Sequence, residues 1–178
     1  MNSFYTNEEV SLLGFKSVGS NVLISKKASF YGIENISLGN NVRIDDFCIL
    51  TGNITIGNYV HIAAYCGLYG KFGIEMEDYS GLSIRCTLLS ASDDFSGNYL
   101  VGPTIETVKT NVNGGKIILK KYVTIGLNSV VFPKILIGEG TVVGAMSLVN
   151  KDLDEWGIYI GIPAKRKSDR QKGLLDLL

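Results

Sequence analysis

A six-residue period in the apolar residues constrains the fold of this chain more than any other feature of its sequence. Starting at Val18, every sixth residue is Val, Ile, Leu, Met or Phe. The series restarts two residues late at Leu38 and again at Met76, and it resumes at Leu119 after a gap. A period of six fits neither an α-helix nor an alternating strand, and it is typical of a parallel β-helix. The ladder positions are Val18, Ile24, Phe30, Leu38, Ile44, Leu50, Ile56, Ile62, Leu68, Met76, Leu82, Leu88, Leu119, Ile125, Val131, Ile137, Val143 and Val149.

The position four residues after a ladder position is frequently small, as at Cys48, Cys66, Cys86, Ser129 and Ser147. A short strand and a turn, repeated three times per coil, would bury both the ladder residue and this small residue, so we predict an all-β parallel β-helix of about six coils. The cysteines are interpreted as small packing residues without a disulfide or metal role. The coils are expected to begin near Val18, Leu38, Ile56, Met76, Leu119 and Ile137.

Both ends of the repeat carry segments that are expected to cap it, because the ends of a solenoid need polar covers. Thr6 and Glu9 have capping-box spacing before an apolar run, which predicts a short helix over the first coil. The segment 168–178 is expected to form a second short helix. The sequence therefore predicts an N-terminal cap over 1–17, a β-helix domain over 18–154 and a C-terminal extension over 155–178.

The ladder stops between Ser92 and Ile117, so residues 93–116 are predicted to form one long excursion loop. A loop of this length inside a compact domain is usually functional or disordered. We therefore expect the excursion to take part in the function of the protein.

Charge and hydropathy exclude several classes of partner. Lys and Arg total 17 and Asp and Glu total 17, so the formal net charge is zero and gives no indication of nucleic acid or an anionic membrane. No apolar run approaches the roughly 18 residues that a membrane span requires. The polar, acidic start of the chain does not resemble a secretory signal. A cytoplasmic protein without a membrane span is expected.

The ladder, the excursion and two later segments carry a resemblance to a known family. The segments are "VTIGLNSVVFPKILIGEGTVVGAMSLVNKDL" at 123–153 and "GIYIGIPAKRK" at 157–167. Over residues 18–167 the chain resembles the hexapeptide-repeat acyltransferases, and within them the galactoside and sugar O- or N-acetyltransferases. The resemblance implies a left-handed β-helix and a homotrimer. It also implies acetyl-CoA as cosubstrate, bound in the groove between subunits, and no metal.

The resemblance also implies which residues contact the coenzyme. Backbone groups of Gly126, Leu127 and Ala145 would meet the pantetheine arm, and Asn150 and Lys151 would contact the coenzyme further out. The end of the family motif would lie near the adenine and phosphates. Basic side chains there suit the phosphate charges of coenzyme A. The residues at that end are Pro163, Lys165 and Arg166.

The catalytic base of the family is missing from its usual place. A galactoside-type histidine would fall at the start of the excursion, where this chain has Asp93 and Asp94. The reference pKa of Asp is about 3.9, which makes it a weak base at neutral pH. His61, the one histidine, lies next to the inward Ile62 and should point outward on a different face from Asp93. His61 and the two aspartates would meet only across a subunit boundary. They remain alternative candidates for the catalytic base.

The predicted function is an acetyl-CoA-dependent acetyltransferase. Its acceptor would be an amino or hydroxyl group of a nucleotide-linked or lipid-linked sugar in surface polysaccharide biosynthesis. A hydroxyl needs a strong base, whereas an amine is already a nucleophile, so the missing histidine favours N-acetylation. Arg85 and Tyr99 are candidates for holding the acceptor. A xenobiotic acetyltransferase and an inactive structural trimer remain as alternatives. A β-helical carbonic anhydrase is excluded, because it needs three His ligands per zinc.

Overall fold

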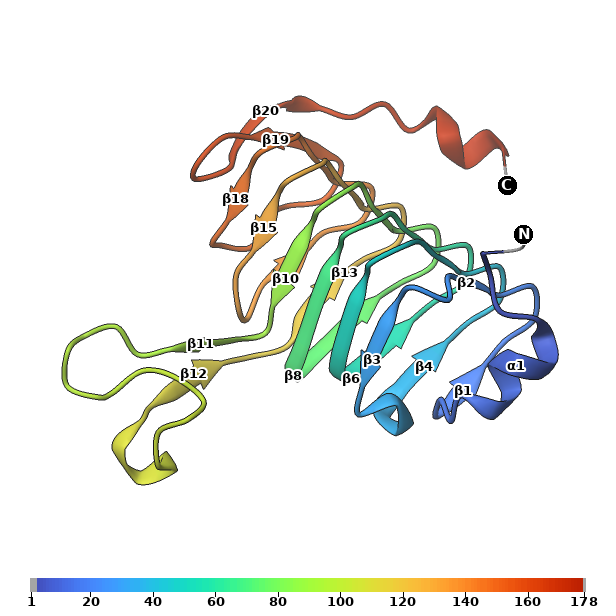
Figure 1. Ribbon diagram of the computed structural model, residues 1–178. Helices are drawn as coiled ribbons and strands as arrows, with labels where there is room; N and C mark the ends of the chain where they lie inside the picture. Colours follow the sequence, from blue (N-terminus) through green and yellow to red (C-terminus); the bar gives the residue numbers. More distant parts are fainter. Residues whose placement is uncertain (1–2, 178) are drawn as a thin grey trace.

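The computed structural model describes residues 3–177 and consists of stacked coils, each made of three short strands (Figure 1). The first face contains β1 (Ser17–Val18), β4 (Ile36–Leu38), the end of β6 (Ile49–Ile56), the end of β8 (Gly67–Met76), β13 (Ile117–Leu119) and β16 (Leu136–Ile137). The second face contains β2 (Leu23–Ile24), β5 (Arg43–Ile44), β7 (His61–Ile62), β9 (Gly81–Leu82), β14 (Thr124–Ile125), β17 (Val142–Val143) and β19 (Gly157–Ile160). The third face contains β3 (Ser29–Tyr31), the starts of β6 and β8, β10 (Thr87–Leu89), β15 (Val130–Val131) and β18 (Leu148–Val149).

The strand register confirms the apolar ladder. Leu88 of β10, for example, pairs with Leu68 in the coil before it and with Val131 in the coil after it. The ladder residues are buried, except for Val18 and Phe30 in the first coil, where no further coil covers them. The fold is therefore the predicted left-handed parallel β-helix. It has six complete coils in residues 3–177 and the start of a seventh, where Ile137 bridges to Leu153.

The two-residue shifts of the ladder are absorbed at the corner between the third and first faces. After the first coil, the short 3-10 helix η1 (Ile33–Asn35) holds the extra residues. After the third coil, the extra residues lie within β8, between Gly70 and Ile74, which pair with Gly52 and Ile54. Both shifts therefore leave the registers of the flanking coils intact.

The corner between the first and second faces carries aromatic residues in the left-handed backbone region. Tyr59, Tyr79 and Tyr122 have φ values of 57°, 58° and 62°. Such values are unfavourable for bulky residues. The rings of Tyr59 and Tyr79 stack with centroids 4.8 Å apart, and those of Tyr79 and Tyr122 stack at 5.4 Å. Stacking between successive coils offsets the local backbone strain.

The short helix predicted near the N-terminus forms. Helix α1 (Asn7–Leu12) begins after Thr6, whose side chain accepts from the Glu9 N–H while the Glu9 side chain accepts from the Thr6 N–H. Val10 points inward and is buried over the first coil. No helix among residues 3–177 has the length and apolar character needed to cross a membrane.

The C-terminal end differs from the predicted helix. Residues Lys165–Asp169 form β20, which pairs antiparallel with β19, and only Gly173–Leu177 are helical, as the 3-10 helix η3. The exposed edge of β19 explains the strand, because its unpaired backbone groups need partners. Arg170 then fixes the tail across the corner by donating to the carbonyl oxygens of Tyr122 at 2.8 Å and Gly140 at 3.0 Å.

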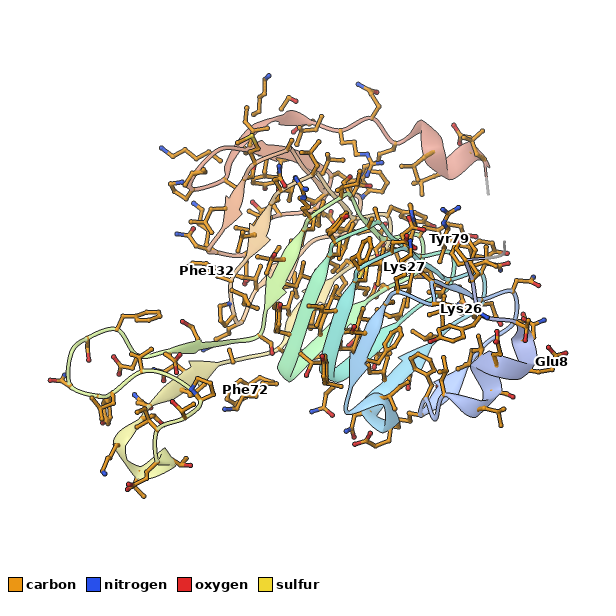
Figure 2. The ribbon with its side chains drawn as sticks, viewed as in Figure 1. Glu8, Lys26, Lys27, Phe72, Tyr79 and Phe132 are labelled. Carbon is orange, nitrogen blue, oxygen red and sulfur yellow. The ribbon has the colours of Figure 1, made fainter. Side chains whose placement is uncertain are left out.

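The excursion forms an ordered arm, which comprises residues 91–114 and projects away from the coils (Figure 1). Strands β11 (Ala91–Asp93) and β12 (Val112–Gly114) pair antiparallel at its base, and the 3-10 helix η2 (Thr107–Lys109) lies near its far end. Figure 2 shows the Phe72 side chain beside this base. The coils continue directly across the insertion, because Met76 pairs with Leu119.

Candidate active site

His61 lies on the outer surface of the second face, next to Arg43 of the preceding coil, which is its register partner. Asp45, at the corner after β5, joins the two side chains. Its Oδ2 lies 2.7 Å from His61 Nε2, and its Oδ1 accepts from Arg43 Nε at 2.7 Å. About half of the His61 side chain is exposed (53%), whereas Asp45 is largely covered. The histidine is thus held in place and still open to a ligand.

The charge state of Asp45 determines which nitrogen of His61 is basic. Burial raises the pKa of Asp45, but hydrogen bonds from His61 and Arg43 outweigh it and hold the pKa below its ordinary value. An ionised carboxylate only accepts hydrogen bonds, so neutral His61 donates its Nε2–H to Asp45. The other ring nitrogen, Nδ1, then carries the lone pair that can accept a proton.

A shallow cavity of about 460 Å³ extends across the second face from His61 to Leu127. Most of its lining is apolar, and Ser83 is one of its polar lining residues. Apolar walls with a few polar groups are typical of sites for small molecules. The lining residues are His61, Ala63, Gly81, Leu82, Ser83, Ile84, Thr124 and Leu127.

The cavity ends at the predicted pantetheine residues. Leu127 and Ala145 occupy successive coils at the corner between the second and third faces, and the Met146 N–H donates to the Leu127 carbonyl at 2.8 Å. A Cβ atom on Gly126 would lie 2.6 Å from the Ala145 nitrogen, so only glycine permits this approach of the two coils. Of these corner residues, Leu127 lines the same cavity as His61.

A second cavity, of about 620 Å³, lies between the arm and the third face. Asp93 contributes to its wall from β11, and Lys71 brings a positive charge from β8. The remaining lining combines hydroxyl groups with apolar side chains. The lining residues are Tyr69, Lys71, Leu89, Ala91, Ser92, Asp93, Gly102, Pro103, Ile105, Thr107, Thr110 and Val112.

Asp94 has a different environment from its neighbour Asp93. Its Oδ1 accepts from the Ser96 N–H at 2.8 Å, and its Oδ2 accepts from Asn111 Nδ2 at 2.8 Å. These hydrogen bonds, those of Ser96 foremost, lower the pKa of Asp94. The Asp94 carboxylate therefore ties the two sides of the arm together and is a weak base, whereas Asp93 faces the cavity.

The two predicted acceptor residues lie in separate parts of the chain. Arg85 sits at the corner after β9, where its guanidinium carbon lies 5.3 Å from the centroid of the Tyr65 ring. Tyr65 in turn stacks on Phe47 at 4.9 Å. Tyr99 lies on the arm and is partly exposed. Arg85 is thus part of a row of side chains along one corner, and Tyr99 belongs to the excursion.

The residues predicted to contact the outer part of the coenzyme lie at the C-terminal end of the coils. Asn150 and Lys151 are exposed after β18, and Pro163 lies between β19 and β20. Lys165 projects into solvent from β20. The neighbouring Arg166 is held by hydrogen bonds to the Tyr159 hydroxyl at 3.0 Å and to Asp169 Oδ1 at 2.8 Å.

Sequence reasoning missed Ser83 and Lys71, which line the two cavities, and Asp45, which contacts His61. The spacing of 18 residues between Arg43 and His61 is the signal that would have revealed the cluster around Asp45, because it makes them neighbours on successive coils. Ser83 and Lys71 have no comparable signal. Within residues 3–177, no group of three His, Cys, Asp or Glu side chains is arranged to hold a metal ion.

Comparison with known proteins agrees with this architecture. The family model for the bacterial transferase hexapeptide (six repeats) matches residues 35–70. The dTDP-4-amino-4,6-dideoxy-D-glucose acyltransferase of Escherichia coli is 45% identical over 175 residues, covering 96% of this chain and 91% of the relative.

Two solved structures extend the comparison to the fold. AntD, an N-acyltransferase from Bacillus cereus, was crystallised with dTDP and coenzyme A as a variant in which an aspartate is replaced by alanine. It is 56% identical, with a TM-score of 0.97 over 99% of this chain and 96% of that one. The perosamine N-acetyltransferase of Caulobacter crescentus is 20% identical, with a TM-score of 0.64 over 83% of this chain and 57% of that one, and shares the fold. The resemblance predicted from the sequence is therefore confirmed, and the chain belongs to the hexapeptide-repeat acyltransferase family.

Proposed function

We propose that this protein transfers an acyl group from acyl-CoA to the amino group of a dTDP-linked 4-amino-4,6-dideoxy sugar. The observation that carries the proposal is the cavity that joins a histidine, oriented by Asp45, to the corner at Gly126 and Leu127. The acylated nucleotide sugar would serve as a building block of surface polysaccharide.

The relatives support the substrate class. The Escherichia coli relative is named for dTDP-4-amino-4,6-dideoxy-D-glucose, and AntD was crystallised with that sugar nucleotide and coenzyme A as a variant with a substituted serine. The residue types replaced in AntD are a serine and an aspartate. This chain presents Ser83 in the first cavity and Asp93 in the second. AntD also binds 3-hydroxybutyryl-CoA, so the size of the acyl group is part of the test.

The placement of the two cavities supports a site shared between subunits. His61 and Ser83 lie on the second face, whereas Asp93 and Lys71 lie between the arm and the third face. We propose a homotrimer in which the arm of one subunit lies against the second face of its neighbour. Arg85 and Tyr99 would then approach the acceptor from different subunits. The Lys71 ammonium group would meet the diphosphate of the sugar nucleotide.

In the proposed mechanism, the nitrogen of the neutral amine attacks the thioester carbonyl carbon. A C–N bond forms, the C–S bond breaks, and the thiolate of coenzyme A leaves. His61 Nδ1 accepts the proton that the nitrogen loses, and Asp45 stabilises the resulting imidazolium. Apolar walls around Leu82 and Leu127 exclude water, which limits hydrolysis of the thioester.

Coenzyme A would extend along the corner toward the C-terminal end. The pantetheine arm would contact the backbone at Gly126, Leu127 and Ala145. The outer part would reach Asn150, Lys151, Pro163, Lys165 and Arg166, and the positive charges of Lys151, Lys165 and Arg166 suit its phosphates. We further propose that 18–154 is the catalytic domain, with 1–17 and 155–178 as its caps. The three cysteines are free and buried, which fits a reducing cytoplasm as its compartment.

The test is the release of thiol from acetyl-CoA and 3-hydroxybutyryl-CoA in the presence of purified acceptors. The panel pairs dTDP-4-amino-4,6-dideoxyglucose with its 4-hydroxy analogue and includes chloramphenicol to test the xenobiotic alternative. Wild type is compared with His61→Ala and with Lys16→Ala, a surface control in the first coil. We expect turnover on the amino sugar alone, with about a 10²-fold loss of kcat in His61→Ala only.

Two other results would change the conclusion. Equal turnover on the hydroxy sugar or on chloramphenicol would reject the proposed acceptor. Full activity of His61→Ala would remove the histidine from the mechanism and leave Asp93 as the candidate base. Light scattering of the wild type measures its oligomeric state separately from its activity. An enzyme that is active as a monomer would exclude a site shared between subunits.

A further inference from the structure

The small inward side chains at the corner between the second and third faces have a shared hydrogen-bonding pattern. Each one lies against a backbone carbonyl oxygen of the next coil, at the position where the chain leaves the second face. The donor-to-oxygen distances are 3.1 Å for Cys48 Sγ to Ala63, 3.1 Å for Cys66 Sγ to Ser83, 3.2 Å for Cys86 Sγ to Gly126 and 3.0 Å for Ser129 Oγ to Gly144.

Packing alone does not account for this column of donors. The corresponding inward positions at the corner between the first and second faces hold Val22, Val42, Val60 and Val123 in four coils. In the other two they hold Ser80 and Thr141, and Thr141 Oγ1 donates to the Asp154 carbonyl at 2.7 Å. Valine therefore fills an inward corner position of this solenoid well. The corner beside the first cavity instead has thiol and hydroxyl groups in four successive coils.

The inward carbonyl groups determine where the adjoining N–H groups point. In a trans peptide the C=O and the N–H point in opposite directions. Because Cys66 binds the carbonyl of Ser83 inside the coil, the N–H of Ile84 in the same peptide points outward. The same holds for Cys86 and the N–H of Leu127. Within residues 3–177, neither the Ile84 nor the Leu127 amide has a hydrogen-bond acceptor.

Ile84 and Leu127, which carry these two amides, both line the first cavity. An exposed N–H beside an apolar wall is a donor for a ligand carbonyl oxygen. The acyl-pantetheine arm carries such oxygens in its amide groups and in its thioester. Donors that are fixed before the reaction stabilise the negative charge that develops on the thioester oxygen.

We propose that Cys66 and Cys86 are positioning residues for acyl transfer. Their thiols fix the Ser83–Ile84 and Gly126–Leu127 peptides so that both N–H groups face the carbonyl oxygens of the acyl-pantetheine arm. This inference rests on the proposed function and adds the internal groups that orient its donors. It assigns a role to two buried residues that do not touch the substrate.

The pKa shifts favour the protonated thiol, which is the donor form, at Cys48 and Cys66 but not at Cys86. The hydrogen bond with Cys66, together with burial, raises the pKa of Cys48. The thiol of Cys48 lowers the pKa of Cys66, but its contact with Cys86 and its burial prevail and raise the pKa to about 12. The pKa of Cys86 is lowered from its ordinary value, chiefly by the Cys66 thiol.

The experiment compares alanine and serine at each position. Cys66→Ala and Cys86→Ala remove the donor, whereas Cys66→Ser and Cys86→Ser keep one, as Ser129 does naturally one coil further on. Cys48→Ala is the matched control, because it removes a thiol from the same column whose carbonyl partner, Ala63, lies two coils before the Gly126–Leu127 peptide. Calorimetry gives the Kd for coenzyme A, thiol release gives kcat and KM, and thermal melting gives Tm for every variant.

We expect kcat/KM to fall about 10- to 100-fold in the two alanine variants, with recovery in the serine variants and little change in Cys48→Ala. If an alanine variant fails to fold, the corresponding valine variant fills the space without a donor and takes its place. Wild-type kcat/KM in Cys66→Ala and Cys86→Ala would overturn the inference. So would losses that serine does not restore, because these would indicate packing alone. If the wild-type protein turned over no acceptor, the proposed function would be rejected. This result differs from the two results that would overturn the role of the cysteines.

Discussion

Asp78 lies directly over Asn58 in the next coil, and its Oδ1 accepts both the Asn58 backbone N–H at 2.7 Å and the Asn58 side-chain amide at 3.1 Å. Asn58 Oδ1 in turn accepts from the Asn40 backbone at 2.8 Å and from the Asn40 side chain at 3.0 Å. The Asn40 Oδ1 then accepts from the Ser20 N–H at 2.8 Å. A ladder of side chains thus joins four successive coils at the corner that begins the second face.

Replacement of Asn58 by alanine should destabilise the coil stack. The variant removes the acceptor of the Asn40 backbone N–H and side-chain amide, and it leaves Asp78 Oδ1 with only the backbone N–H of residue 58. The loss of these side-chain hydrogen bonds costs about 0.5–1.5 kcal/mol in the free energy of unfolding. Urea denaturation measures the change, and Asn98→Ala on the arm is the control because it removes the same side chain from an exposed position. Equal stability of the two variants would show that the ladder contributes nothing.

Asp45 should make the stability of the protein sensitive to acid. The pKa of Asp45 is lower in the folded chain than in the unfolded chain, so its ionised form stabilises the fold above the unfolded pKa of about 3.9. This contribution is lost as the pH falls through the folded pKa. We expect Asp45→Asn to be less stable than wild type at pH 7, and the difference to shrink below about pH 4.

The measurement is urea denaturation of both proteins at a series of pH values between 7 and 3. A difference in unfolding free energy that stays constant over the series would contradict the assignment. Asp94 gives a useful comparison, because its pKa is also lowered but its hydrogen bonds lie within the arm.

Gly126→Ala should weaken coenzyme A binding and lower Tm together. The new Cβ would lie 2.6 Å from the Ala145 nitrogen and 2.7 Å from the Gly144 carbonyl carbon, both of which are backbone atoms that cannot rotate away. The two coils must therefore separate at the proposed pantetheine site. Gly173→Ala is the control, since its Cβ would meet nothing within 4 Å. Unchanged Tm and coenzyme affinity in Gly126→Ala would refute the close contact.

Lys71→Ala should raise the KM for the sugar nucleotide and leave the KM for acyl-CoA unchanged. The ammonium group lines the cavity under the arm, where we place the diphosphate. Loss of one charge contact should raise KM about tenfold, and added salt should reduce the difference between variant and wild type. Lys109→Ala on the same arm is the control, because Lys109 already pairs with Glu106. An equal rise in the KM values for the sugar nucleotide and for acyl-CoA would contradict a specific contact between Lys71 and the diphosphate.

The coils were predictable from sequence because each one repeats the same two constraints. A ladder residue such as Leu88 must fill the interior, and a small residue such as Cys86 must fit the corner. The C-terminal strand Lys165–Asp169 gave no such signal, since every one of its side chains is exposed and its pairing depends only on the free edge of β19. Propensity and periodicity describe side chains that are buried, and this strand buries none.

The site was predictable only in part for a related reason. His61 was found because histidine is rare and chemically distinctive, but its orientation depends on Asp45, 16 residues earlier. Asp93 and Asp94 are equivalent in the sequence. Asp94 is held by hydrogen bonds from Ser96 and from Asn111, and Asn111 lies 17 residues away across the arm. Long-range partners of this kind carry no local pattern.

The attachment of the arm at Ser90 has a consequence for how such a protein can diversify. Ser90 donates its N–H to Tyr69, its carbonyl accepts from Gly115, and its hydroxyl accepts from the Phe72 N–H, so the chain leaves and re-enters the coils at one closed point. The insertion can change in length or composition without moving the coil above or below it. In the proposed function the arm contributes to the acceptor site and the coils bind acyl-CoA. Changes in the arm can therefore alter the choice of acceptor while the coils that bind the acyl donor stay the same.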